Sequence, residues 1–182
     1  MILVLIVVVV IVLWAVATYN GLIGLRVRSE NAWSDINVQL KRRYDLIPNI
    51  VETVKGYASH EQKVFQQVTE ARSRAMGAST PGEKGAAESA LAGSLRGLIA
   101  IAENYPQLRA NENFLGLQKS LTEIEEAVQS ARRYYNAVVR DFNTKTQVLP
   151  DALIANIGGF KAKEFFQLDS PDEAKNPKVS FT

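Results

Sequence analysis

The chain has 182 residues, of which 47% are hydrophobic, and its 21 basic and 19 acidic side chains leave a formal net charge of +2. This near balance argues against a nucleic-acid-binding protein, whose domain would carry a strong basic excess. The absence of cysteine excludes disulfides, thiol catalysis, a lipoprotein anchor and cysteine-based metal sites.

The chain opens with an uninterrupted apolar segment. Residues 1–25 contain no acidic or basic side chain, and the first 13 are all Met, Ile, Leu or Val. An apolar helix crosses the hydrocarbon core of a bilayer with about 20 residues at about 1.5 Å each. Trp14 and Tyr19 lie where an aromatic belt would meet the lipid headgroups, and Arg26 and Arg28 follow as charged anchors. We therefore predict a transmembrane anchor over residues 1–25.

A cleaved signal peptide is the main alternative for this segment, because residues 15–17 (Ala-Val-Ala) have the small-x-small form of a cleavage site. A signal peptide normally opens with a basic region, which the apolar start lacks, so a retained span is favoured. Positive charge flanks only the C-terminal side of the segment, through Arg26, Arg28 and residues 41–43. The positive-inside rule then predicts a cytoplasmic rather than a periplasmic position for the rest of the chain.

A heptad register continues without a skip from Trp33 to Ala75, with spacings that alternate between three and four residues. This pattern keeps one apolar stripe towards a partner helix, as in helical bundles and coiled coils. Only Arg43 and Glu61 are not typical of such a seam. Because Pro48 lies inside the register, the segment is either one kinked helix or two helices that meet near residues 45–48.

Capping signals divide the rest of the chain into helices. A break is expected at residues 56–59, where Ser59 and Gln62 have the spacing of a capping box. After a loop at residues 76–85, Thr80, Pro81 and Glu83 are typical of an N-cap, a first and a third helical residue. That helix is expected to reach about residue 104, with its stripe formed by Ala87, Leu91, Ser94, Leu98, Ile101 and Tyr105.

Asn111 is the predicted N-cap of the most regular helix in the chain. Its stripe consists of Phe114, Leu117, Leu121, Ile124, Val128, Ala131, Tyr135, Val138 and Phe142. The helix should stop before Pro150, because the residue ahead of a proline is disfavoured in the helical region. We expect a short helix over residues 151–156, a break at Gly158 and Gly159, and an extended or disordered tail over residues 159–182.

Four stretches carry a recognisable pattern: residues 31–57 (NAWSDINVQLKRRYDLIPNIVETVKGY), 103–106 (ENYP), 131–136 (ARRYYN) and 177–181 (PKVSF). Together they resemble the LemA family. The resemblance covers essentially the whole chain and implies a bacterial, membrane-anchored, antiparallel four-helix bundle. It implies a fold more than an activity.

Two polar motifs on the predicted helices have a structural and a functional interpretation. The first consists of Arg42, Arg43, Tyr44, Asp45, Pro48 and Asn49, and the second of Arg132, Arg133, Tyr134 and Tyr135. Side chains of the first motif could satisfy the backbone groups that a proline leaves free. The second motif is expected to lie on a solvated or intrabundle face. The alternative for both motifs is a surface that recognises a partner.

We find no convincing catalytic or metal-binding motif in the sequence. His60 is the only histidine, and the residues after His60-Glu61 lack the second histidine of a metalloprotease motif. Residues 77–84 (GASTPGEK) depart from a phosphate-binding loop, because Glu83 separates the second glycine from the lysine. Phe160, Phe165 and Phe166 could cover an open end of the bundle or dock onto a neighbouring chain. We predict no cofactor, no metal and no enzyme activity.

The sequence therefore predicts an all-α protein with an N-terminal transmembrane helix followed by an antiparallel four-helix bundle with long helices. The expected domains are an anchor over residues 1–25, a bundle over 26–158 and a tail over 159–182. The expected function is a non-catalytic scaffold or adaptor in the bacterial inner membrane. Its expected partners are the lipid bilayer, further copies of the chain and other membrane proteins, with no nucleic acid. The alternatives are a signalling component or an accessory subunit of a membrane enzyme.

Overall fold

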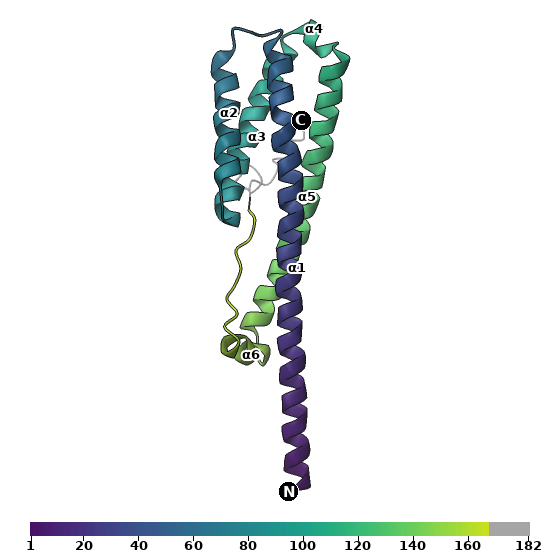
Figure 1. Cartoon of the computed structure of the whole chain (residues 1–182), viewed down its shortest axis with the longest axis vertical. Helices are drawn as coiled ribbons and strands as arrows, with labels where there is room; N and C mark the ends of the chain where they lie inside the picture. Colours follow the sequence, from purple (N-terminus) through teal and green to yellow (C-terminus); the bar gives the residue numbers. More distant parts are fainter. Residues whose placement is uncertain (168–182) are drawn as a thin grey trace, which may run out of the picture. The chain divides into compact units, whose positions relative to one another are not determined.

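The computed structural model describes residues 1–167, and this part of the chain forms six helices and no strand (Figure 1). The helices are α1 (Ile2–Lys55), α2 (Gln62–Gly77), α3 (Pro81–Glu103), α4 (Pro106–Arg109), α5 (Glu112–Gln147) and α6 (Asp151–Ile157). The predicted all-α class with long helices is confirmed. The tail motif at residues 177–181 lies outside the described residues.

The chain is organised as two compact units. Unit 1 consists of residues 1–41 and 125–165. Unit 2 consists of residues 42–124 and, among the described residues after α6, Phe166 and Gln167. Helices α1 and α5 each contribute one part to unit 1 and the other part to unit 2, so neither unit is a continuous stretch of sequence. The expected domain boundaries at residues 25 and 158 stay a prediction.

Helix α1 is continuous over 54 residues, with Pro48 in its interior. Of the two alternatives at the proline, the structure therefore has the single helix. A proline in a helix removes one backbone donor, the N–H that would bond to the carbonyl four residues earlier. At this position that carbonyl belongs to Tyr44. The helix ends at Lys55, where the predicted break begins.

The start of α2 corrects one prediction. The expected capping box of Ser59 and Gln62 is wrong, because α2 begins only at Gln62 and its N-cap position is Glu61, without a side-chain cap. Residues 57–60 form turns instead, in which the N–H groups of Tyr57 and Ala58 donate to the Val54 carbonyl at 3.0 and 2.9 Å. Because these turns follow the end of α1, the next helix begins only after them, at Gln62.

The start of α3 is as predicted. The Thr80 hydroxyl accepts from the Glu83 N–H at 3.2 Å, and the Glu83 carboxylate accepts from the Thr80 N–H at 3.2 Å. Hydrogen bonds from the backbone N–H groups of Ser79 and Thr80 lower the pKa of Glu83. Pro81 is the first helical residue. The loop before it is shorter than expected, because α2 continues to Gly77.

The buried face of α3 is rotated from the predicted stripe. Its buried residues are Lys84, Gly85, Glu88, Leu91, Leu95, Leu98 and Ala102. Only Leu91 and Leu98 belong to both sets. The hydropathy pattern missed the true face because Lys84 and Glu88 occupy two of its positions. Helix α3 packs against α2 within unit 2, and the two helices run in opposite directions (Figure 1).

Helices α5 and α6 begin and end where the sequence indicates. Asn111 Oδ1 accepts from the Phe114 N–H at 3.0 Å, as expected of an N-cap. Helix α5 ends at Gln147, before Pro150, and α6 covers the predicted short helix with one residue more. The short helix α4 was not predicted. The chain leaves α6 through Gly159, whose φ of +68° favours glycine.

The segment after α6 runs back along α5 in unit 1. Asn143 holds it with two hydrogen bonds, from its amide to the Lys163 carbonyl at 2.9 Å and from the Lys163 N–H to its oxygen at 2.8 Å. The Tyr135 hydroxyl donates to the Glu164 carbonyl at 2.9 Å. Phe160 is partly buried in unit 1.

In unit 2, Phe166 is fully buried and Gln167 passes directly over Gly85. A Cβ atom on Gly85 would lie 1.8 Å from the Gln167 carbonyl oxygen, so only glycine permits this approach. Phe160 and Phe166 therefore pack within the protein itself, which favours the first of the two alternatives for these phenylalanines. Phe165 is partly exposed, at 37%.

Candidate functional site

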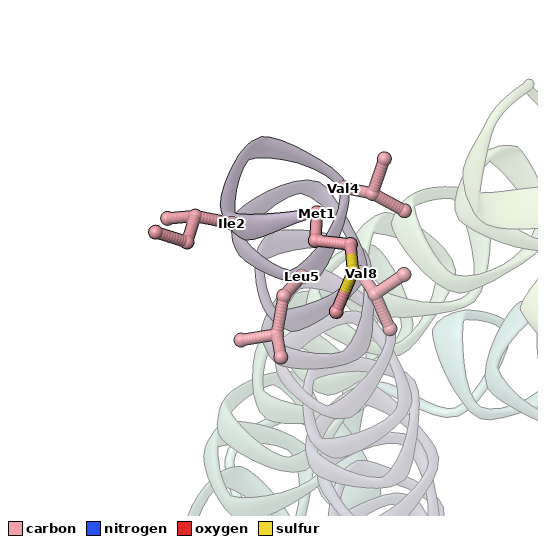
Figure 2. A pocket seen from close by; sticks show the side chains of 5 residues that line it. All are labelled: Met1, Ile2, Val4, Leu5 and Val8. Atoms are coloured by element: carbon pink, nitrogen blue, oxygen red, sulfur yellow. The ribbon is translucent and has the colours of Figure 1, made fainter.

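The start of α1 exposes apolar side chains in every direction. Figure 2 shows an apolar hollow at this end, lined by Met1, Ile2, Val4, Leu5 and Val8. The labelled side chains point to different sides of the helix, so the apolar surface surrounds it. A helix that is apolar all round is normally buried in a large protein or in a membrane. Among the described helices, α1 alone is long and apolar enough to cross a membrane.

The predicted boundary residues lie where this apolar surface meets the rest of unit 1. Trp14 is half-buried. The Tyr19 ring meets the Phe160 ring edge-on, with 5.6 Å between centroids, and the Arg26 guanidinium lies 5.7 Å from the centroid of that ring. Arg28 is exposed. Sequence reasoning did not predict that Phe160, which is far along the chain, would join Tyr19 and Arg26.

Helix α6 is fixed to the same part of α1. Thr18 Oγ1 donates to Asp151 Oδ1 at 3.2 Å, and Lys145 Nζ lies 3.8 Å from Asp151 Oδ2. A small apolar cluster completes the contact. It consists of Leu22, Phe142 and Ala155, with Leu25, Ile154 and Phe160 packed against them. These contacts place the first residues of α6 beside the end of the apolar segment.

The first polar motif forms the centre of a buried polar cluster in unit 2, which we define as Arg43, Tyr44, Arg72 and Glu88. Arg43 Nη1 donates to Glu88 Oε2 at 2.7 Å, and both side chains are almost completely buried. The Tyr44 hydroxyl makes a short hydrogen bond to Glu88 Oε1 and lies 3.3 Å from the Ala75 carbonyl oxygen. A buried carboxylate is tolerated here because it is paired and hydrogen-bonded.

Arg72 supplies the hydrogen-bond donor that α1 lacks at Pro48. Its Nε donates to the Tyr44 carbonyl at 2.8 Å. That carbonyl is four residues before Pro48 and has lost its helical donor. We expected side chains of the motif itself to satisfy the freed backbone group. The donor comes instead from α2, so the gap in α1 becomes a contact between two helices.

Within the buried polar cluster, the Tyr44 hydroxyl keeps its proton. Burial raises the pKa of the Tyr44 hydroxyl far above its ordinary value, and the hydrogen bond to Glu88 raises it further. Tyr44 is therefore a neutral donor at physiological pH and does not act as a base. Nearly complete burial also keeps Glu88 away from solvent. This arrangement suits a structural role better than acid–base chemistry on a substrate.

The remaining residues of the first motif lie on the exposed surface of α1. Arg42, Asp45 and Asn49 are exposed on α1, and the Asn49 carbonyl accepts from the Thr53 hydroxyl at 2.7 Å. Pro48 is also exposed. A role of these residues in partner recognition stays a prediction.

The second motif has two faces in unit 1. Tyr134 is exposed, whereas Tyr135 is buried, and its ring centroid lies 5.3 Å from that of Trp33. Arg132 is half-buried, and Arg133 is exposed and donates to the Ser130 hydroxyl at 3.0 Å. Burial and a charge interaction with Glu164 raise the pKa of Tyr135. The motif therefore contributes one core residue, Tyr135, and one exposed aromatic side chain, Tyr134.

Two residues of the buried polar cluster, Glu88 and Arg72, were not singled out in the sequence. Arg43 at a seam position was the available signal, because a buried arginine requires an acidic partner. Nothing in the spacing identified which acid. Within residues 1–167, no group of three or more His, Cys, Asp or Glu residues could hold a metal ion. His60 is exposed in the turn before α2.

These features define an all-helical protein in which, over residues 1–167, α1 is the helix apolar enough to cross a membrane. The sequence model of the LemA family matches residues 32–181, so the chain belongs to this family. The family resemblance seen in the sequence is thereby confirmed.

Curated relatives include two magnetosome proteins of Paramagnetospirillum magneticum, MamQ 1 and MamQ 2. Each is 23% identical to this chain over 82% of its length and 64% of the relative. The protein LemA of Metamycoplasma hominis is 24% identical over 77% of this chain and 67% of the relative. The chain thus spans about two thirds of the length of these relatives.

Proposed function

We propose that this protein is a membrane-anchored, non-catalytic scaffold of the LemA family that acts by binding other proteins and further copies of itself. The observation that carries the proposal is the construction of α1. Its exposed apolar start suits a lipid environment, and the same helix continues without a linker into both units. A bundle built on its own anchor is presented at a fixed place on the membrane surface.

The chemistry of the buried polar cluster supports a non-catalytic role. Arg43, Tyr44 and Glu88 bond to one another inside unit 2, and Arg72 bonds to the backbone of α1. Each of these groups therefore has a structural explanation. A catalytic acid or base would instead have to reach a bound substrate directly or through one water.

The proposal is tested by crosslinking the full chain in native membranes, followed by solubilisation and size analysis. A scaffold predicts crosslinked species larger than the monomer that contain a second copy or another membrane protein. A chain that stays monomeric and captures no partner would contradict the proposal.

We further propose that the protein lies in the bacterial inner membrane, with the part of the chain after the apolar start of α1 in the cytoplasm. Arg26 and Arg28 support this orientation, because cytoplasmic flanks carry the excess of basic residues. The chain has no cysteine, so single cysteines can be probed in intact cells with an impermeant thiol reagent. A cytoplasmic C-terminus predicts labelling of Ile2→Cys and protection of Thr182→Cys. The reverse pattern would place the bundle outside.

A further inference from the structure

The outward face of α6 carries two of the three larger apolar side chains of this short helix, whereas Ile154 packs inward against the cluster of Leu22, Phe142 and Ala155. Leu153 is 55% and Ile157 is 85% exposed, and Leu149, in the turn before the helix, is 71% exposed. The buried residues of α6 are two alanines, Ala152 and Ala155. A helix that packs only against its own protein gains more by burying its larger apolar side chains. This face of α6 therefore suits an apolar environment outside the protein.

The position of α6 indicates what that environment is. Within unit 1, the helix is bonded to α1 through Thr18 and Asp151, and the rings of Tyr19 and Phe160 meet edge-on. Figure 1 shows α6 at the end of α5, beside α1, with the apolar start of α1 continuing beyond it. The exposed face of α6 thus lies next to the place where the apolar segment ends.

The length of the apolar start of α1 determines the depth at which α6 lies in a membrane. This step rests on the anchoring proposed above. The apolar residues up to Tyr19 rise about 28 Å as a helix, which is close to the roughly 30 Å thickness of a hydrocarbon core. If they span the core, Thr18 and Tyr19 lie at the boundary between acyl chains and headgroups. Because Asp151 of α6 bonds to Thr18, and Phe160, three residues after the end of α6, contacts Tyr19, α6 lies at the same boundary.

We propose that α6 is an interfacial foot that inserts into the bilayer crossed by α1, with Leu149, Leu153 and Ile157 as its inserting residues. A lipid surface fits better than a protein partner because Asp151 bonds α6 to Thr18, next to the exposed Tyr19, where the apolar start of α1 ends.

The charges near the foot also suit a lipid surface. The Arg26 guanidinium lies over the Phe160 ring, and Lys161 is exposed in the segment that follows. Both can reach lipid phosphates, since basic side chains favour the headgroup level. Asp151, the one acidic residue of α6, is partnered by Lys145 and Thr18. The foot therefore presents apolar side chains flanked by positive charge.

The test measures the depth of single labelled positions in the full chain. An environment-sensitive fluorophore is attached to one cysteine at a time, Leu153→Cys or Ile157→Cys, and the protein is reconstituted into vesicles of phosphatidylcholine and phosphatidylglycerol. Lipids that carry a quencher at known depths then report the depth of the label. Val8→Cys measures the anchor. Gln129→Cys, exposed on α5 and about 27 Å along that helix from its end, measures a water-facing position.

We expect quenching at Val8, and quenching at Leu153 and Ile157 with a depth of about 5–10 Å below the headgroups, the depth typical of interfacial helices. The label at Gln129 should be quenched only by a water-soluble quencher. One outcome would overturn the foot and leave the anchor intact. In that outcome the label at Val8 is quenched by lipid, but the labels at Leu153 and Ile157 are as accessible to water as the label at Gln129. A water-accessible label at Val8 would overturn both.

A second variant separates insertion from local protein contacts. Ile157→Glu, made in the Leu153→Cys chain, places a charge on the inserting face and should shift the label towards the water-soluble quencher. Asn156→Glu, on the neighbouring exposed position, is the matched control and should leave the depth of the label unchanged. If the label at Leu153 is shielded from both quenchers, protein covers this face and the lipid foot is wrong.

Discussion

Arg43 occupies a heptad position that would ordinarily carry an apolar side chain, and its burial is possible only because α3 supplies Glu88. Two charges removed from water lose hydration, and their attraction compensates only with good geometry. Such a pair adds little net stability compared with apolar residues of similar size, but it discriminates strongly against arrangements that separate its members. The pair therefore fixes which faces of α1 and α3 meet.

Replacement of Glu88 by Gln should leave Arg43 buried without a counter-charge. We expect the free energy of unfolding to fall by about 3–5 kcal/mol, as for other broken buried pairs. Denaturant unfolding of the full chain in detergent micelles, followed by circular dichroism, measures this change. Glu103→Gln, at an exposed end of α3, is the matched control and should change stability by at most about 0.5 kcal/mol. Equal losses of stability from the two substitutions would contradict a structural role for the Arg43–Glu88 pair.

Arg72 and Pro48 should be coupled, because the arginine bonds to the carbonyl that the proline leaves free. Arg72→Met should destabilise the protein by about 1–3 kcal/mol through the unsatisfied Tyr44 carbonyl. In a Pro48→Ala chain the helical N–H is restored, so the same change at Arg72 should cost clearly less. A double-mutant cycle of unfolding free energies tests this. An equal cost in both backgrounds would show that the two residues act independently.

The protein should lose stability in alkaline solution because of two buried tyrosines. The pKa values of Tyr44 and Tyr135 are raised in the folded protein, so their stabilising contribution is complete below pH 10, the ordinary tyrosine value. Above that pH an unfolded chain releases these protons, and stability should fall by at most about 1.4 kcal/mol per pH unit for each residue.

Unfolding free energies at pH 8 to 11, compared between the natural chain and Tyr135→Phe, check this dependence. The variant should show a shallower loss above pH 10, because it has one raised pKa fewer. Identical pH profiles for the two chains would mean that Tyr135 does not contribute.

Residue partners were the least predictable part of the structure. The sequence register placed Arg43 on the buried seam, yet it could not identify Glu88 as the partner, because Glu88 interrupts the apolar stripe of its own helix. The role of Arg72 was equally unpredictable, because it depends on the backbone N–H that is missing at Pro48, 24 residues earlier. Partners of this kind are determined by how the helices pack, and the spacing of residues along one helix gives no information about that packing.

At the scale of elements, local signals were sufficient wherever the helix end is determined by its own residues. Thr80, Pro81 and Glu83 marked the start of α3, and Asn111 marked the start of α5. The Ser59 signal failed, because turns at the end of α1 occupied those residues. Helix α4, a single turn, has too few residues for any periodicity.

The capping box of α3 provides an element-scale prediction. Thr80→Ala removes the side-chain oxygen that accepts from the Glu83 N–H and should destabilise the protein by about 1 kcal/mol. Ser79→Ala, at the exposed neighbour, keeps the capping box and should be close to neutral. The measurement is again denaturant unfolding of the full chain. A loss no greater than that of Ser79→Ala would show that α3 does not depend on this cap.

At the scale of the whole molecule, membrane retention should depend on the uncharged start of α1. Val8→Asp combined with Val10→Asp adds two buried charges, each costing about 3 kcal/mol near the centre of a membrane helix. We expect the variant to leave the membrane fraction during alkaline carbonate extraction. Val38→Asp introduces the same side chain on an exposed position of the same helix and should remain bound. Full retention of the double variant would contradict the anchor.

The absence of any break between the apolar start of α1 and the part that packs in unit 1 has a mechanical consequence. A hydrophobic stretch that is longer than the local bilayer is thick accommodates the difference by tilting. With no hinge between anchor and packed helix, unit 1 must tilt by the same angle. A protein built in this way converts the thickness of its membrane into an orientation of its surface.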